Sequence, residues 1–207
     1  MKLKRFREGC ILIKENLIDT KQPILLIGAS TGGPNAIEII LRELTRDLNL
    51  IVLIVQHMPK GFTRTFAERL NKICDLNVME ATDGIKISKN NVYIAPGGYH
   101  MILNENGVIN LNTDALVWGV RPAVDKLFIS ASSIYKENVI SVVLTGMGKD
   151  GAKGSVKVKE NNGITIAQDQ KTSVIYGMPR VAFETGYIDY VLPLNDIVKK
   201  VKSLIKD

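Results

Sequence analysis

The strongest constraint on the fold is a series of short apolar runs that alternate with helical patterns. Four runs, at residues 23–27, 50–55, 139–144 and 163–167, have the length and aliphatic character of strands buried on both faces. Such alternation predicts an α/β fold: a doubly wound, mostly parallel sheet with helices on both faces. The apolar positions expected on four helices are Ile37, Ile40, Leu41 and Leu44; Phe62, Phe66, Leu70 and Ile73; Val124, Leu127, Phe128 and Ile134; and Ile197, Val198, Val201, Leu204 and Ile205.

The middle of the chain breaks this alternation. Residues 92–95, 99–103 and 108–111 are short strand-like runs, and Asn104-Glu105-Asn106-Gly107 is a hairpin turn signal between the last two. We therefore expect an antiparallel β-hairpin excursion from the main sheet in this region.

Ser30 lies on a glycine-flanked turn between the first apolar run and a helix. Gly28, Ser30 and Gly32 fit the pattern G-x-S-x-G, in which small neighbours allow a sharp turn that exposes the serine hydroxyl. Pro34 suits the first position of the helix, whose N-terminal end would point back at the serine. The turn can therefore support both nucleophilic attack and stabilisation of an oxyanion.

Glycine-rich turns between a strand and a helix also bind phosphates and nucleotides, so a non-catalytic binding module is the main alternative. Two details count against it. Ser30 replaces the second glycine of G-x-G-x-x-G, and the turn has no lysine of the kind that a P-loop requires.

Chemically suited side chains follow three of the apolar runs. In a parallel sheet these positions share one edge, where ligands bind. Ser30 follows the first run, His57 the second and Asp150 the third. Each alone is more often a turn, loop or cap residue, but together they are the groups that acyl transfer needs. The other histidine, His100, falls in the predicted antiparallel region and is interpreted as structural.

Composition narrows the class of protein. With 207 residues, 45% of them hydrophobic, the chain can form one core, and we expect residues 1–20 to be an arm or linker and 21–207 one compact domain. Two cysteines predict a reducing, cytoplasmic setting, and the basic N-terminal segment has too short an apolar run for secretion or membrane insertion. The net charge of +6 comes mostly from lysine rather than arginine, which argues against nucleic-acid binding.

Five motifs occur in order along the chain. They are Gly28-Ala29-Ser30-Thr31-Gly32-Gly33-Pro34, Gln56-His57-Met58-Pro59, Tyr93-Ile94-Ala95-Pro96-Gly97-Gly98, Arg121-Pro122-Ala123-Val124-Asp125 and Leu144-Thr145-Gly146-Met147-Gly148-Lys149-Asp150-Gly151-Ala152. Together they resemble the motifs of the CheB family of chemotaxis receptor methylesterases (protein-glutamate methylesterases), specifically its catalytic domain. The resemblance covers about residues 23–194.

The resemblance implies a role for each residue of the site. Ser30 would be the nucleophile, His57 the general base and acid, and Asp150 the group that orients the imidazole. Thr31 and Met147 would supply backbone N–H groups to an oxyanion hole. The implied reaction is hydrolysis of glutamate γ-methyl esters on the cytoplasmic helices of chemoreceptors, with release of methanol, and deamidation of receptor glutamines as a further activity.

Partners and alternatives follow from the same features. An acidic receptor helix would favour a basic rim, for which Arg121 is the substrate-binding candidate, with Lys60, Arg64 and Arg69 equally open to interpretation as a solvated face. Family members usually carry an N-terminal receiver domain, so we expect this chain to be either a stand-alone catalytic domain or an excised fragment. In the second case a receiver domain is a further expected partner. The chemistry needs no metal or organic cofactor.

Two alternative functions remain. The chain could be a related esterase or amidase in another signalling system, or a receptor-docking protein with a silent site.

Overall fold

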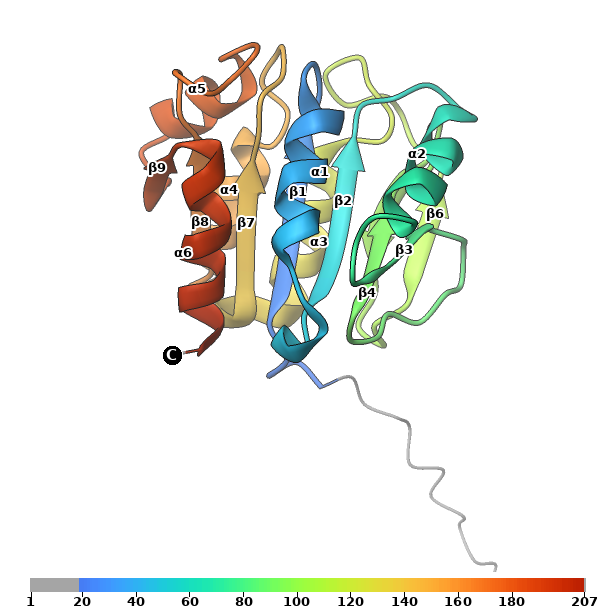
Figure 1. The fold of residues 1–207 in the computed structure, drawn as a ribbon. Coiled ribbons are helices and arrows are strands. Elements are labelled where there is room, and N and C mark those ends of the chain that lie inside the picture. Colours follow the sequence, from blue (N-terminus) through green and yellow to red (C-terminus); the bar gives the residue numbers. More distant parts are fainter. Residues whose placement is uncertain (1–18, 207) are drawn as a thin grey trace, which may run out of the picture.

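The computed structural model describes residues 19–206, and nearly all of the predicted arm over residues 1–20 lies outside this range. The centre of the fold is a seven-stranded sheet in the order β3-β4-β2-β1-β7-β8-β9, in which every pairing is parallel (Figure 1). The strands are β1 (Ile24–Ala29), β2 (Ile51–Gln56), β3 (Asn77–Glu80), β4 (Asn91–Ile94), β7 (Val139–Val143), β8 (Ile164–Gln168) and β9 (Tyr190–Leu192).

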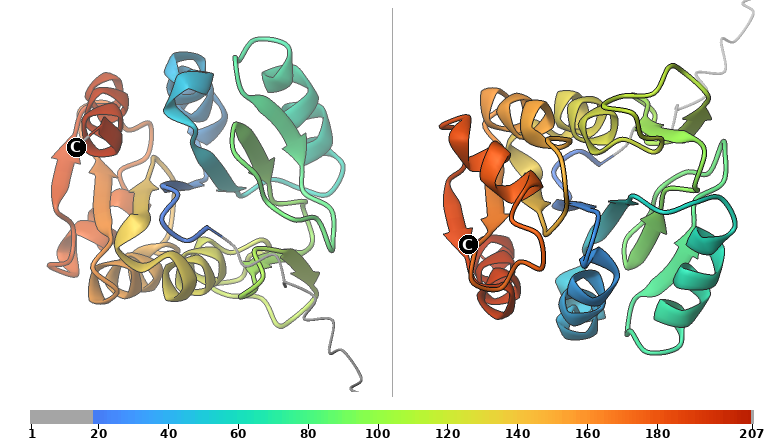
Figure 2. Two further views of the ribbon diagram at one scale, coloured as in Figure 1. Left: turned by 90° about the horizontal axis from the view of Figure 1, so that it is seen from below. Right: turned by 90° about the horizontal axis from the view of Figure 1, so that it is seen from above.

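Helices cover both faces of the sheet, so the fold has three layers (Figure 2). One face carries α1 (Gly33–Glu43), α2 (Phe62–Asn71) and α6 (Leu194–Lys206). The other carries α3 (Val124–Tyr135), α4 (Ala152–Glu160), α5 (Met178–Glu184) and the antiparallel hairpin of β5 (His100–Leu103) and β6 (Ile109–Asn112). Two short 3-10 turns lie at Arg46–Leu48 and Lys136–Asn138. Within the described range, no helix combines the length and apolar character needed to cross a membrane.

Alternate residues of the central strands enter two separate cores. On β1, Leu25 and Ile27 face the core under α1, α2 and α6, whereas Ile24 and Leu26 face the core under α3 and the hairpin. All four side chains are fully buried. The requirement to fill both faces explains why these strands appear in the sequence as continuous apolar runs rather than alternating ones.

The predicted fold class is confirmed, and so is the hairpin between residues 99–103 and 108–111. The prediction for residues 92–95 is wrong, because β4 belongs to the parallel sheet, where it pairs with β2 and β3. A four-residue strand has no sequence signal for the direction of its partner. Phe62 is also misplaced: it begins α2 at the edge of the sheet, and its side chain is 64% exposed.

The strand order reverses at β1. From β1 the chain crosses through α1 on one face to β2, whereas β7, on the other side of β1, leads into α4 on the opposite face. The loops that follow β1 and β7 therefore separate in opposite directions. In sheets of this kind, the crevice between such loops at the carboxyl ends of the strands is where ligands bind.

The central strand is the most sensitive position for stability. Replacing Ile27, which is fully buried, with alanine should lower the free energy of unfolding by about 2–5 kcal/mol, because the cavity cannot collapse between two packed layers. Urea unfolding followed by circular dichroism measures this loss. Val191→Ala on the edge strand β9, where the side chain is 38% exposed, is the matched control and should cost less than about 1 kcal/mol. Equal losses would contradict this account of the core.

The carboxylate of Asp189, immediately before the edge strand β9, is bonded to Thr165 on β8 and to Lys159 on α4. It accepts hydrogen bonds from the backbone N–H of Thr165 at 2.9 Å, from the Thr165 hydroxyl at 3.0 Å and from the Lys159 ammonium. Burial alone would raise the pKa of Asp189, but the bonds from Lys159 and Thr165 outweigh it and hold the pKa below its ordinary value.

A carboxyl whose pKa is lower in the folded state stabilises the fold above its unfolded pKa and loses that contribution as the pH falls through the folded pKa. Asp189→Asn should therefore destabilise the protein by about 1–2 kcal/mol at pH 7. The difference from the parent protein should shrink below about pH 4. Urea unfolding of both proteins between pH 7 and pH 3 tests this, and a difference independent of pH would contradict it.

Candidate active site

The three predicted chemical groups meet in one cavity at the carboxyl edge of the sheet, the upper edge in Figure 1. The cavity has a volume of about 230 Å³ and lies where the strand order reverses. Its lining includes both residues predicted for the oxyanion hole. The lining residues are Ser30, Thr31, His57, Trp118, Val120, Met147, Gly148, Lys149 and Asp150.

The backbone of Ser30 is hydrogen-bonded to the loop after β7 and to the start of α1. Its N–H donates to the carbonyl of Thr145, beyond β7, at 3.0 Å, and its own carbonyl accepts from the N–H of Gly33 at 2.8 Å. Gly32, the residue immediately before α1, has a φ of 82°, a left-handed conformation that side chains disfavour. This glycine, two residues after the serine, therefore lets the chain turn from strand to helix.

Gly146 allows the loop after β7 to press against the serine. A Cβ atom added at Gly146 would lie 2.7 Å from Cβ of Ser30 and 2.5 Å from the sulfur of Met178. Both separations are shorter than non-bonded carbon contacts, so any side chain at this position would displace the serine turn.

His57 follows β2, and its backbone N–H donates to the carbonyl of Ala29 at 3.0 Å. The ring Nε2 lies 2.8 Å from Oδ2 of Asp150, and the two side chains are 11% and 2% exposed. An ionised carboxylate only accepts hydrogen bonds, so Nε2 carries the proton, which leaves Nδ1 as the nitrogen with a free lone pair. No hydrogen bond joins Ser30 to this ring within residues 19–206; in serine sites that bond often forms fully only with substrate bound.

Asp150 is held by the first turn of α3. Its Oδ2 accepts from the backbone N–H of Val124 at 2.7 Å, and its Oδ1 accepts from Asp125 at 2.9 Å and from Gly151 at 3.0 Å. The N–H groups of Val124 and Asp125 have no acceptor within the first turn of α3, and the helix dipole there favours negative charge. The carboxylate that contacts His57 therefore also caps a helix.

Asp125 caps the start of α4 in the way that Asp150 caps the start of α3. Its Oδ1 accepts from the backbone N–H of Gly151 at 2.9 Å and of Gly154 at 2.8 Å, and its Oδ2 accepts from the indole N–H of Trp118 at 2.8 Å. Burial raises the pKa of Asp125, with a further contribution from the nearby charge of Asp150 and opposition from these hydrogen bonds. Sequence reasoning included Asp125 in a motif but assigned it no role.

Thr31 and Met147 lie where the predicted oxyanion hole requires a donor to be available, and their role in it stays a prediction. Both line the cavity beside Ser30, and neither backbone N–H donates to another residue within the described range. Thr31 is further fixed because its carbonyl accepts from the hydroxyl of Thr145 at 2.9 Å.

Gln56 is a buried residue of the site that sequence reasoning did not single out. Its side-chain amide donates to the carbonyls of Ser30 and His57, both at 3.0 Å, and so joins the serine loop to the histidine loop. A polar residue that closes an otherwise apolar strand was the available signal.

The guanidinium group of Arg121 is hydrogen-bonded to backbone carbonyls of the protein. It donates to the carbonyls of Thr113 at 2.7 Å and Asp114 at 2.9 Å, and the residue lines a neighbouring cavity of about 340 Å³ together with His57. These bonds fix the loop over residues 113–121, and a role in substrate binding stays a prediction.

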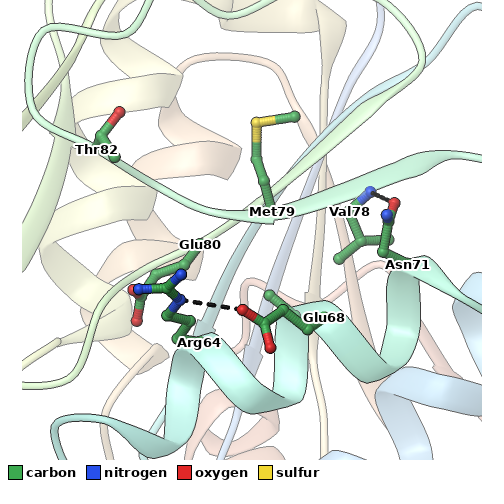
Figure 3. Close-up of a pocket in the computed structure, with 8 residues that line it drawn as sticks. Arg64, Glu68, Asn71, Val78, Met79, Glu80 and Thr82 are labelled. Carbon is green, nitrogen blue, oxygen red and sulfur yellow. Dashed lines mark hydrogen bonds and ion pairs between the residues drawn. The ribbon is translucent and has the colours of Figure 1, made fainter.

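His100, Arg64 and Arg69 are not among the residues that line the cavity around Ser30. His100 is fully buried, its Nε2 donates to the carbonyl of Ala115 at 3.1 Å, and burial lowers its pKa. Arg64 pairs with Glu68 at 3.0 Å beside a separate cavity of about 310 Å³ between α2 and β3 (Figure 3). Arg69 pairs with Glu38. The contacts of the two arginines favour interpretation as a solvated face.

Fold and site together define an α/β protein with a serine, a histidine and an aspartate gathered at the switch point of a parallel sheet. A family model described as CheB methylesterase matches residues 25–201, and the chain belongs to this family. The crystal structure of the Thermotoga maritima CheB methylesterase catalytic domain superimposes with a TM-score of 0.85 at 45% sequence identity, covering 88% of this chain and 98% of that one.

Two further relatives are named protein-glutamate methylesterase/protein-glutamine glutaminase. The protein from Clostridium acetobutylicum is 50% identical over 182 residues, which is 88% of this chain and 53% of that protein. The protein from Pyrococcus horikoshii is 46% identical over 183 residues, 87% of this chain and 50% of that protein. The chain thus spans about half the length of these relatives.

The double role of Asp150 predicts a loss of stability when its carboxyl group is removed. Asp150→Ala leaves the N–H groups of Val124 and Asp125 buried without their acceptor, so the free energy of unfolding should fall by about 2–4 kcal/mol. Asp150→Asn keeps an acceptor oxygen and should lose less. Urea unfolding of the three proteins decides the point; equal stability of parent and alanine variant would show that the cap is dispensable.

Proposed function

We propose that this chain is a serine hydrolase that demethylates glutamate γ-methyl esters on the cytoplasmic helices of chemoreceptors and releases methanol. The observation that carries the proposal is the single cavity lined by Ser30, His57 and Asp150, with the imidazole bonded to the carboxylate at 2.8 Å, in a member of the CheB methylesterase family. The names of its relatives supply the substrate class. Residues 21–207 would form the catalytic domain.

The first half of the reaction forms an acyl-enzyme. Ser30 Oγ attacks the ester carbonyl while Nδ1 of His57 takes the hydroxyl proton, since Nε2 is bonded to Asp150. The carbonyl oxygen becomes negative and accepts hydrogen bonds from the N–H groups of Thr31 and Met147, each contributing about 3 kcal/mol. The proton then passes from His57 to the departing methoxide, and methanol leaves.

The second half returns the enzyme to its starting state. A water molecule gives a proton to His57 and attacks the acyl carbonyl, and the same backbone donors hold the second oxyanion. When the bond to Ser30 breaks, the serine recovers its proton from His57, and the carboxylic acid that is released loses its own proton to solvent to become a glutamate carboxylate. Asp150 fixes the ring orientation and stabilises the imidazolium in both halves.

Deamidation of receptor glutamines is a second candidate activity. The relatives' names include protein-glutamine glutaminase. The same steps apply to an amide, because His57 can protonate a departing ammonia as it protonates methanol. Only the leaving group differs.

The decisive experiment measures methanol release from a methylated chemoreceptor cytoplasmic fragment. Ser30→Ala should reduce turnover by a factor on the order of 10⁶, because it removes the nucleophile and leaves only binding and the oxyanion donors. Ser133→Ala is the matched control: it makes the same substitution at an exposed position on α3 and should leave turnover unchanged.

Retained turnover in Ser30→Ala would refute the serine mechanism. Methanol release by neither the parent protein nor the variant would refute the substrate class and direct attention to another ester or amide.

A further inference from the structure

The mouth of the cavity carries an unusual cationic group around Trp118, the only tryptophan of the chain. The ammonium of Lys149 lies 4.0 Å from the centroid of the indole, and that of Lys153 lies 4.9 Å from it. Trp118 and Lys149 both line the cavity that contains Ser30. Two positive charges are thus held on one aromatic ring beside the proposed nucleophile.

The backbone presents this indole in a conformation that is rare for a bulky residue. Trp118 has a φ of 55° and Gly119 a φ of 80°. They form a two-residue turn closed by hydrogen bonds between Val117 and Val120, at 3.0 and 3.2 Å. Non-glycine residues seldom adopt this region, and where they do the position is often functional.

Asp125 fixes the orientation of the ring. Its carboxylate accepts the indole N–H at 2.8 Å, while the two other bonds that it accepts come from Gly151 and Gly154 at the start of α4. The indole is therefore hydrogen-bonded to the side chain of a residue whose own backbone N–H is bonded to Asp150. This connection, together with the turn, sets the position of the ring relative to the cavity.

Within residues 19–206, neither Lys149 nor Lys153 forms an ion pair with a carboxylate, whereas Lys157, one turn further along α4, pairs with Glu160. Lys153 also lies in the first turn of α4, which has no acidic residue and where the helix dipole disfavours a cation. An anion bound at these two lysines would offset both positive charges and, at Lys153, the unfavourable interaction with the helix dipole.

We propose that Trp118, Lys149 and Lys153 form a subsite for a carboxylate of the substrate, next to the ester that Ser30 attacks. The proposal rests on the function proposed above and adds a specificity: a methylated glutamate with acidic neighbours should be preferred over one with neutral neighbours. Lys149 lines the cavity of Ser30, so an anion bound there would belong to the same substrate molecule as the ester. Charge-assisted hydrogen bonds from two ammonium groups suit a carboxylate.

A competition assay tests this specificity directly. Two peptides containing a glutamate γ-methyl ester, one flanked by glutamates and one by glutamines, are mixed and their hydrolysis is followed by mass spectrometry. The parent protein should favour the acidic peptide about tenfold, as expected for two partly exposed charge pairs. Lys149→Met with Lys153→Met should bring the ratio close to one. Because a ratio is measured, any general loss of activity cancels.

Two variants serve as controls. Lys157→Met removes the same charge from α4 one turn further on, where the lysine pairs with Glu160, and should keep the tenfold preference. Lys149→Arg with Lys153→Arg retains both charges and should also retain a preference. A parent protein that shows no preference, or a double methionine variant that keeps it, would overturn the proposed subsite.

Tryptophan fluorescence separates failure of the subsite from failure of the proposed function, because binding needs no turnover. Titration with the acidic peptide in its unmethylated form should change the emission of Trp118, and the double methionine variant should bind about tenfold more weakly. If neither peptide is hydrolysed but this charge-dependent binding is observed, the function is refuted and the carboxylate site is upheld. Binding that is unaffected by the lysine substitutions overturns the subsite.

Discussion

The site depends on an exchange of carboxylates between two helices. Asp150, just before α4, accepts the N–H groups at the start of α3, and Asp125, in the first turn of α3, accepts the N–H groups at the start of α4. Each helix thus supplies the cap of the other. The exchange fixes the distance between the two helix ends, and through Asp150 it fixes His57 as well. Although His57 lies on a loop, its imidazole is therefore held in place by a carboxylate that is itself bonded to the helix ends.

Much of the architecture could be predicted because its signals are local. A strand buried on both faces must be apolar throughout, so the four central runs identified β1, β2, β7 and β8. Short or edge strands carry no such mark. β3 and β9 are half exposed and mix polar with apolar residues, and the partners of β4 are set by tertiary packing alone. The helix α4 was not identified because its lysines obscure a narrow apolar face.

The site shows the same division between local and tertiary information. Ser30, His57 and Asp150 follow apolar runs, so the rule that parallel strands end at one edge predicted that they would meet. The roles of Asp125 and Gln56 depend on contacts between elements distant in the sequence, and no spacing reveals them. The requirement for glycine at position 146 also depends on a tertiary contact, because the serine turn packs against it and leaves no room for a side chain.

The two duties of Asp150 affect what its presence in a related sequence would mean. A descendant that no longer needed the chemistry would be free to replace Ser30, whose side chain makes no hydrogen bond within the described range. The same descendant would be under pressure to keep Asp150, because losing it would uncap α3. The presence of the aspartate in a related sequence is therefore weak evidence that the protein is active. Inactive relatives should lose the serine before they lose the aspartate.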